Sequence, residues 1–220
     1  MFAFLKPFED LLLQILNFFY QYVQNYGTAI ILLTVLVRVI MLPLTIKQTK
    51  SMRALQKIQP KLKKLQEKHK GDKERLQKEM MKFYAEHKVN PLSGCLPLLL
   101  QMPIFIALFR MLIANENLKR AGFLWLKNLD KPDPYLILVG LMVITTYLSQ
   151  KMITADPQQE KMMLPMTLLM AFIALRLPSG VLIYWVTTNI LTMIQQYFTV
   201  RLTESSEEGQ QQTAEIPTKP

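Results

Sequence analysis

One arginine, Arg38, sits in the middle of the first long apolar run of this 220-residue chain. The run, residues 26–46, is long enough to cross a hydrocarbon core of ~30 Å, which takes about 20 residues of helix. At that depth a guanidinium cannot easily reach either surface, and placing it there costs at least about 2.5 to 3.5 kcal/mol. Arg38 is therefore the first candidate functional residue.

An arginine inside a membrane usually pairs with an acid, but the apolar runs of this chain supply none. Residues 11–66, 87–115, 134–155 and 161–203 contain neither Asp nor Glu. A guanidinium stays charged under all accessible conditions. We therefore expect Arg38 to face water, side-chain dipoles or an acid that arrives on another molecule.

Polar side chains in several apolar runs could line a water-containing cavity around Arg38. The candidates for this groove, besides Arg38 itself, are Thr34, Gln101, Gln150, Trp185 and Asn189. Each of them could instead make a polar contact between helices, which contributes only about 0.6 kcal/mol on average. The residues alone leave both interpretations open.

The sequence predicts no catalytic residue, no cofactor and no metal site. It contains no HExxH, GxSxG or Walker motif, and its two histidines, His69 and His87, lie outside the apolar runs. The single cysteine excludes a disulfide framework, and without a Cys/His cluster we expect no zinc. We expect neither an enzyme nor a proton-coupled carrier, which would need a titrating group in the membrane.

The composition is that of a polytopic membrane protein. Half of the residues are hydrophobic (50%) and the mean hydropathy is +0.16. We expect an all-α fold with five transmembrane helices, and the predicted spans are 26–46, 93–113, 134–152, 163–177 and 178–200. A turn containing Pro178 and Gly180 separates the last two spans.

The distribution of charge predicts the orientation in the membrane. Residues 46–88 hold 14 Lys/Arg against 5 Asp/Glu, whereas the rest of the chain holds 12 against 11. Because short basic segments stay in the cytoplasm, we expect this segment and the loop at 153–162 inside, and the N-terminus and the loop at 114–133 outside. Five spans then leave the C-terminus in the cytoplasm, and the expected location is a bacterial cell membrane.

Residues 47–89 are predicted to form a basic cytoplasmic helical hairpin with a turn near Gly71. One apolar stripe includes Leu55, Ile58 and Leu62, and a second includes Met80. The lysine-rich faces could be merely solvated, or they could contact anionic lipid headgroups or a polyanion such as ribosomal RNA. The sequence does not separate these alternatives.

The remaining segments are predicted from amphipathicity and polarity. Residues 1–25 form an amphipathic helix suited to the membrane interface, which we expect to remain in the mature protein because Glu9 and Asp10 interrupt a signal-peptide core. Arg110 lies near an outer span end and can reach the surface. The polar tail over 201–220 is expected to be disordered.

Three strings of residues resemble the YidC/Oxa1/Alb3 family of membrane protein insertases. They are NPLSGCLPLLLQMPIFIALF at 90–109, LPSGVLIYW at 177–185 and IQQY at 194–197. The five predicted spans, the basic hairpin and the lone arginine also match this family, and the resemblance covers about residues 1–202. The chain is similar to the short bacterial forms, without a large extracytoplasmic domain or a lipid-anchored cysteine.

The resemblance implies an insertase whose spans enclose a hydrophilic groove open to the cytoplasm and to lipid. It implies that Arg38 is the groove arginine, that Thr34 is its polar neighbour, and that Trp185 and Gln150 line the groove. The expected partners are nascent membrane proteins and the lipid bilayer; the Sec translocon, the ribosome and a targeting receptor are further candidates, and DNA is not.

Two other functions remain open at this point. The first is a small anion channel or transporter in which Arg38 binds the solute, and the second is a membrane scaffold that tethers cytoplasmic partners through the basic hairpin. A scaffold would depend on the hairpin and not on Arg38.

Overall fold

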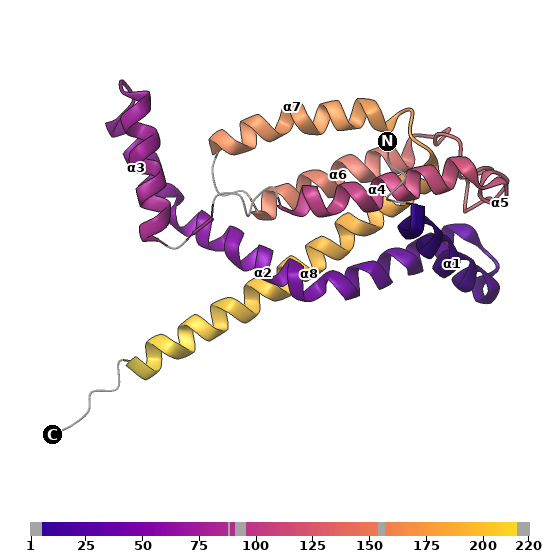
Figure 1. Ribbon diagram of the computed structural model, residues 1–220, viewed down its shortest axis with the longest axis horizontal. Coiled ribbons are helices and arrows are strands. Elements are labelled where there is room, and N and C mark those ends of the chain that lie inside the picture. The colour runs from indigo at the N-terminus through magenta and orange to yellow at the C-terminus, as the bar shows by residue number, and fades with distance from the viewer. Residues whose placement is uncertain (1–5, 88, 91–95, 154–156, 215–220) are drawn as a thin grey trace.

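The computed structural model describes residues 6–87, 89–90, 96–153 and 157–214, and the regular elements of this part of the chain are α-helices, as expected for an all-α fold. In chain order they are α1 (Lys6–Val23), α2 (Tyr26–Lys68), α3 (Lys73–Glu86), α4 (Leu96–Ala114), α5 (Glu116–Lys119), α6 (Ile137–Ile153), α7 (Pro157–Ala174) and α8 (Ser179–Ala214). Figure 1 shows α2 and α8 crossing beneath α4, α6 and α7, with α3 standing apart.

The predicted first span and the first arm of the hairpin form one helix. α2 runs for 43 residues, from the N-cap Asn25, whose side chain accepts a hydrogen bond from the Thr28 amide at 3.0 Å, to His69. Its second half is rich in Lys, Gln and Leu, which favour helix, and the helix continues through Pro43 and Pro60 as far as the turn at Gly71. The predicted boundary at residue 46 is therefore not a break in the helix.

Two other predicted boundaries differ from the structure. α7 begins at Pro157, so most of the loop predicted over 153–162 is helical, and proline is well suited to the first position of a helix. α8 continues to Ala214, into the tail of residues 201–220 for which disorder was predicted, and the disorder of this tail stays a prediction. Glu, Gln and Ala in this segment all favour helix. The predicted span start at 93–95 lies outside the described residues.

The hairpin end of the molecule is held by a small apolar contact. Ile58 and Leu62 of α2 are buried where α3 packs against it. Asp72 caps α3 by accepting a hydrogen bond from the Arg75 amide at 3.0 Å. Ion pairs such as Lys78–Glu74 lie on the exposed face of α3 and contribute little.

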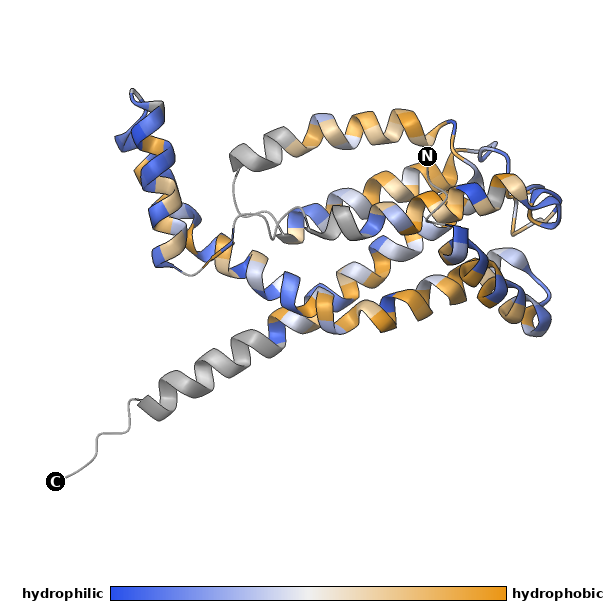
Figure 2. Ribbon diagram, viewed as in Figure 1, coloured by the Kyte–Doolittle hydropathy of each residue, from blue (hydrophilic) through white to orange (hydrophobic). Residues whose placement is uncertain are grey.

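The bundle helices pack around an apolar core. α8 packs against α2 and α6, α7 packs against α6, and α1 packs against α2 and α4. Side chains such as Leu33, Ala107, Met142 and Leu182 are fully buried between them. In Figure 2 apolar residues concentrate in these helices, and hydrophilic residues concentrate in the hairpin and in the loops at the opposite end.

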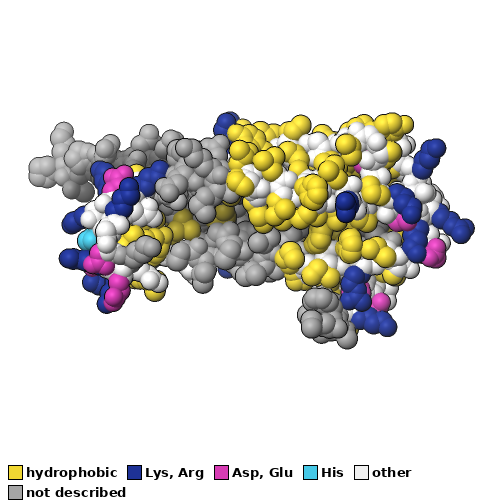
Figure 3. All heavy atoms as spheres, turned by 90° about the horizontal axis from the view of Figure 1, so that it is seen from above, with side chains coloured by type: hydrophobic (Ala, Val, Ile, Leu, Met, Phe, Trp, Pro, Cys, Tyr) yellow, Lys and Arg dark blue, Asp and Glu magenta, His cyan; other side chains and the backbone are white. Residues whose placement is uncertain are grey.

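The outer faces of the bundle helices are also apolar. Ile40, Leu168 and Phe172 are more than 60% exposed, as lipid-facing residues would be. Figure 3 shows a broad apolar face, with charged side chains at the two ends of the molecule. Among the described residues α2 is long and apolar enough to cross a membrane by itself, and the shorter apolar stretches are Gln101–Met111, Ile137–Met152 and Met163–Ala174.

The loop between α5 and α6 fixes the end of the bundle opposite the hairpin, which we call the loop end. The buried carboxylate of Asp133 accepts hydrogen bonds from Trp125 Nε1 at 3.0 Å and from the amides of Tyr135 at 3.1 Å and Leu138 at 2.7 Å. It therefore positions the first turn of α6. The Ser179 amide and hydroxyl donate to the Lys131 carbonyl at 2.8 and 2.6 Å, which positions the start of α8.

The same loop contacts α2 at a glycine, and this contact predicts the effect of a substitution. A Cβ on Gly27 would lie 2.2 Å from the Phe123 ring and 2.6 Å from the Phe123 Cβ, so a new rotamer alone could not relieve the clash. We expect Gly27→Ala to destabilise the protein by about 1–3 kcal/mol through overpacking. Thermal unfolding of the purified protein in detergent, followed by tryptophan fluorescence, measures the effect.

Gly140→Ala is the matched control, because a Cβ at this helical glycine meets nothing within 4 Å. The midpoint of thermal unfolding of this variant should be unchanged or slightly raised, since alanine stabilises a helix by up to about 1 kcal/mol relative to glycine. Equal midpoints for the two variants would contradict the close packing of the loop on α2.

Candidate functional site

Arg38 lies in α2, which packs against α8. Its side chain is half-buried. Within the described part of the chain no carboxylate forms an ion pair with it. The Tyr184 hydroxyl of α8 is close enough to interact electrostatically with the guanidinium. Arg38 therefore has a polar side chain in its surroundings but no acid among the described residues.

Tyr184 links two of the predicted site residues, although the sequence analysis did not select it. It is 3% exposed, and its hydroxyl accepts a hydrogen bond from Gln101 Nε2 of α4. The structure therefore brings Arg38, Gln101 and Tyr184 together where α2, α4 and α8 meet. The available signal was chemical: a buried tyrosine hydroxyl normally requires a polar partner.

Thr34 and Trp185 flank this cluster in different ways. Thr34 is 1% exposed, and its hydroxyl donates to the Ile30 carbonyl of its own helix at 2.7 Å. Trp185 is half-buried and meets Phe105 of α4 edge to face, with ring centroids 5.6 Å apart. Both residues contribute to packing between helices in this structure, and their contact with a substrate stays a prediction.

Asn189 and Gln150 form polar contacts between helices. Asn189 Nδ2 of α8 donates to Thr145 Oγ1 at 3.1 Å and to Thr146 Oγ1 at 2.8 Å, both in α6. Gln150 Oε1 accepts a hydrogen bond from Thr167 Oγ1 of α7 at 3.0 Å. These bonds are the helix contacts that the sequence analysis gave as the alternative, and Gln150 uses its carbonyl oxygen toward α7 rather than toward Arg38.

A second polar group lies between Arg38 and the hairpin, along the contact of α2 and α8. We call it the polar seam; its members are Thr45, Gln48, Gln195 and Gln196. Thr45 Oγ1 donates to Gln195 Oε1 at 3.0 Å. Gln48 Nε2 and Gln196 Oε1 are buried without a partner among the described residues.

Leaving a buried amide atom unpaired costs about 1–3 kcal/mol. The polar seam is therefore a place where water or an incoming polar group would be stabilised. Its position on the hairpin side of Arg38 extends the polar surface of the arginine cluster toward that end of the molecule. No cluster of metal-ligating side chains occurs in the parts of the chain that the structure describes.

Comparisons with known proteins agree on one family. The family model described as 60Kd inner membrane protein matches residues 18–207. A protein named membrane protein insertase YidC from Geobacter sulfurreducens is 44% identical over 199 residues, which are 89% of this chain and 38% of the relative. A protein of the same name from Syntrophus aciditrophicus is 46% identical over 199 residues, again 89% of this chain and 37% of the relative.

A solved structure has a similar fold. The crystal structure described as an active YidC insertase with the first transmembrane domain resolved superposes with a TM-score of 0.71 at 29% identity. The match covers 87% of this chain and 46% of that one. The present chain spans less than half the length of these relatives, 38% in the first case.

The Tyr184–Gln101 hydrogen bond predicts a measurable coupling between α8 and α4. In a double-mutant cycle of Tyr184→Phe and Gln101→Leu we expect a coupling of about 0.6 kcal/mol, and at most about 1.7 kcal/mol, because polar contacts between membrane helices are modest. Unfolding in mixed micelles measures the cycle. Tyr197→Phe, at an exposed position of α8, is the control that should not couple to Gln101→Leu; equal coupling would contradict the bond.

Proposed function

Because this chain belongs to the 60Kd inner membrane protein family, we propose that it is a membrane protein insertase that moves polar segments of nascent membrane proteins from the cytoplasm into the bilayer. The observation that carries the proposal is the arginine cluster: Arg38 is half-buried in an apolar helix, interacts with Tyr184 and has no carboxylate partner among the described residues. A permanent cation that is not paired with an acid of its own protein can pair with an acidic side chain of a substrate.

The physical problem that such a protein solves is the dry path across the membrane. Moving a bare carboxylate through hydrocarbon is prohibitive, because desolvation of an isolated charge is very costly. A polar groove that reaches mid-membrane shortens this path, and Arg38 supplies a transient counter-charge. The polar seam supports access from the hairpin side, because its buried Gln48 and Gln196 atoms would be paired by water or substrate.

The attraction must be weak enough to release the substrate. A solvated ion pair contributes at most about 1 kcal/mol, so the acidic segment can move on. The membrane potential, positive outside, then contributes ~2.3 kcal/mol per negative charge per 100 mV across the whole field. The apolar helix of the substrate leaves sideways into lipid, and no nucleotide is required.

The topology belongs to the same proposal. Five spans with the N-terminus outside place the hairpin in the cytoplasm and the loop end at the outer surface. The apolar face between two charged ends in Figure 3 supports this arrangement. The lysine-rich hairpin would meet substrates first, and lipid headgroups, the ribosome, the Sec translocon and a targeting receptor are its candidate contacts.

Substitutions of Arg38 test the proposal. Arg38→Ala should abolish insertion of a substrate with an acidic translocated segment, whereas Arg38→Lys should retain much of it because the charge remains. Insertion into proteoliposomes with an imposed potential, read by protease protection, measures both. A substrate whose translocated segment lacks acids should depend less on Arg38.

Arg176 provides matched controls, because it is an exposed arginine at the end of α7. Arg176→Ala and Arg176→Lys should both insert normally. Equal loss for Arg38→Ala and Arg38→Lys, with normal Arg176 variants, would mean that the arginine acts through its shape and not through its charge.

Photo-crosslinking from position 38 separates this proposal from its rivals. An insertase should crosslink nascent chains at this position and pass no anions in vesicles without substrate. A channel would conduct anions in that assay. A scaffold would lose function on deletion of 50–88 but not on Arg38→Ala.

A further inference from the structure

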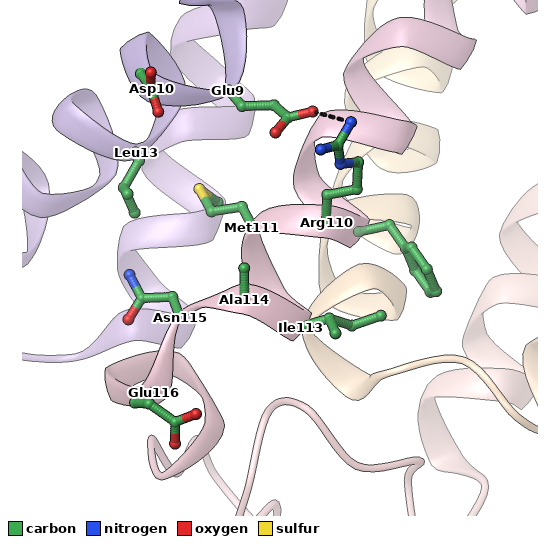
Figure 4. A pocket seen from close by; sticks show the side chains of 10 residues that line it. Glu9, Asp10, Leu13, Arg110, Met111, Ile113, Ala114, Asn115 and Glu116 are labelled. Carbon is green, nitrogen blue, oxygen red and sulfur yellow. Dashed lines mark ion pairs between the residues drawn. The ribbon is translucent and has the colours of Figure 1, made fainter. Parts of the chain in front are cut away.

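A cavity of about 570 Å³ lies between α1 and the end of α4, outside the arginine cluster. Its size falls in the range of small-ligand sites. Figure 4 shows α1 contributing Glu9, Asp10 and Leu13 to one wall and α4 contributing Arg110, Met111 and Ile113 to the other. The lining thus combines apolar side chains with charges of both signs.

One ion pair joins the two walls of the cavity. Arg110 Nη1 and Glu9 Oε1 form an ion pair of 3.0 Å, and the Glu9 side chain is only 13% exposed. The pair connects α1 to α4, so Arg110 does more than reach the surface as the sequence analysis predicted. A guanidinium carries five N–H donors, and one carboxylate oxygen leaves several of them for another acceptor.

The two other acids of the lining differ from Glu9. Lys119 forms an ion pair with Glu116 at 2.6 Å and lowers the pKa of this carboxyl, which keeps it charged. Asp10 is exposed and pairs with no cation among the described residues. In Figure 4 Glu9 lies between Asp10 and the Arg110 guanidinium, so the lining has an unpaired anion on the α1 side and a guanidinium with further donors on the α4 side.

We propose that this cavity binds the headgroup of an ethanolamine phospholipid. The phosphate would accept hydrogen bonds from Arg110, and the primary amine would donate to Asp10. The acyl chains would contact the apolar side chains Leu13 of α1 and Ile113 of α4. The site rests on the proposed topology, which places the loop end at the outer membrane surface, where headgroups lie.

The charge of the lining selects among lipids. Glu9, Asp10 and Glu116 against Arg110 give a net charge of −2 (three acids minus one base), which repels an anionic glycerol headgroup. A choline headgroup carries the same charges as ethanolamine but has no N–H to donate to Asp10. Ethanolamine has both groups that the cavity requires: an amine that donates hydrogen bonds to Asp10 and a phosphate that accepts them from Arg110.

Native mass spectrometry of the full chain in detergent tests the proposal with ethanolamine, choline and glycerol phospholipids of identical acyl chains. Ethanolamine lipid should be retained preferentially. Asp10→Asn should reduce its retention about three-fold, as expected for the loss of one partly solvated ion pair. Asp10 is exposed, so this variant should fold normally.

Glu74→Gln is the control, because it removes the same charge from the exposed face of α3. It should retain ethanolamine lipid like the unaltered chain. Equal retention of the three lipids, or equal retention by Asp10→Asn and Glu74→Gln, would overturn the site. Lipid retention is measured without substrate, so the two proposals can fail separately. If the protein inserts substrates but does not prefer ethanolamine lipid, only this inference is wrong. If it prefers ethanolamine lipid but inserts no substrate, only the proposed function is wrong.

Discussion

The structure depends on one constraint: a guanidinium that cannot lose its charge is held inside an apolar bundle. Ionised groups in an apolar medium must be solvated, and Arg38 has no acid in its own membrane segment to do so. Near Arg38 the bundle places Tyr184 of α8, which interacts electrostatically with the guanidinium and is hydrogen-bonded to Gln101 of α4. Polar side chains of α4 and α8 are therefore available where the charge of α2 needs them.

The two ends of the bundle treat polar groups differently. At the loop end, Asp133 accepts three hydrogen bonds and the Lys131 carbonyl accepts two from Ser179, so the starts of α6 and α8 are fixed. Toward the hairpin, the polar seam leaves Gln48 and Gln196 with unpaired buried atoms. The helix starts are thus fixed by hydrogen bonds at the loop end, whereas the polar seam keeps unpaired buried atoms that water or a polar group could pair.

The sequence predicted the helical class and placed Arg38 inside an apolar segment, because apolar runs and a charge within them are local properties; the role of Arg38 stays a prediction. It did not predict that α2 continues from the membrane into the hairpin, since span prediction follows hydropathy and helix continuity follows propensity. It did not predict that Tyr184 bonds to Gln101 or that Gln150 bonds to Thr167 of α7. The partner of a polar side chain depends on how each helix is rotated about its axis, which the sequence does not show. The Glu9–Arg110 pair joins segments a hundred residues apart, which no local pattern encodes.

The identity of the partner of Arg38 decides what the arginine can do. An internal carboxylate would form a buried salt bridge, and breaking such a pair costs about 3–5 kcal/mol because a charge is left uncompensated. A passing substrate would have to supply that energy. The hydrogen-bonded pair of Tyr184 and Gln101 beside Arg38 carries no charge, so it leaves the net charge of the guanidinium uncancelled. Under the proposed function, the absence of an acid between residues 11 and 66 would let Arg38 attract an acidic substrate segment and release it again.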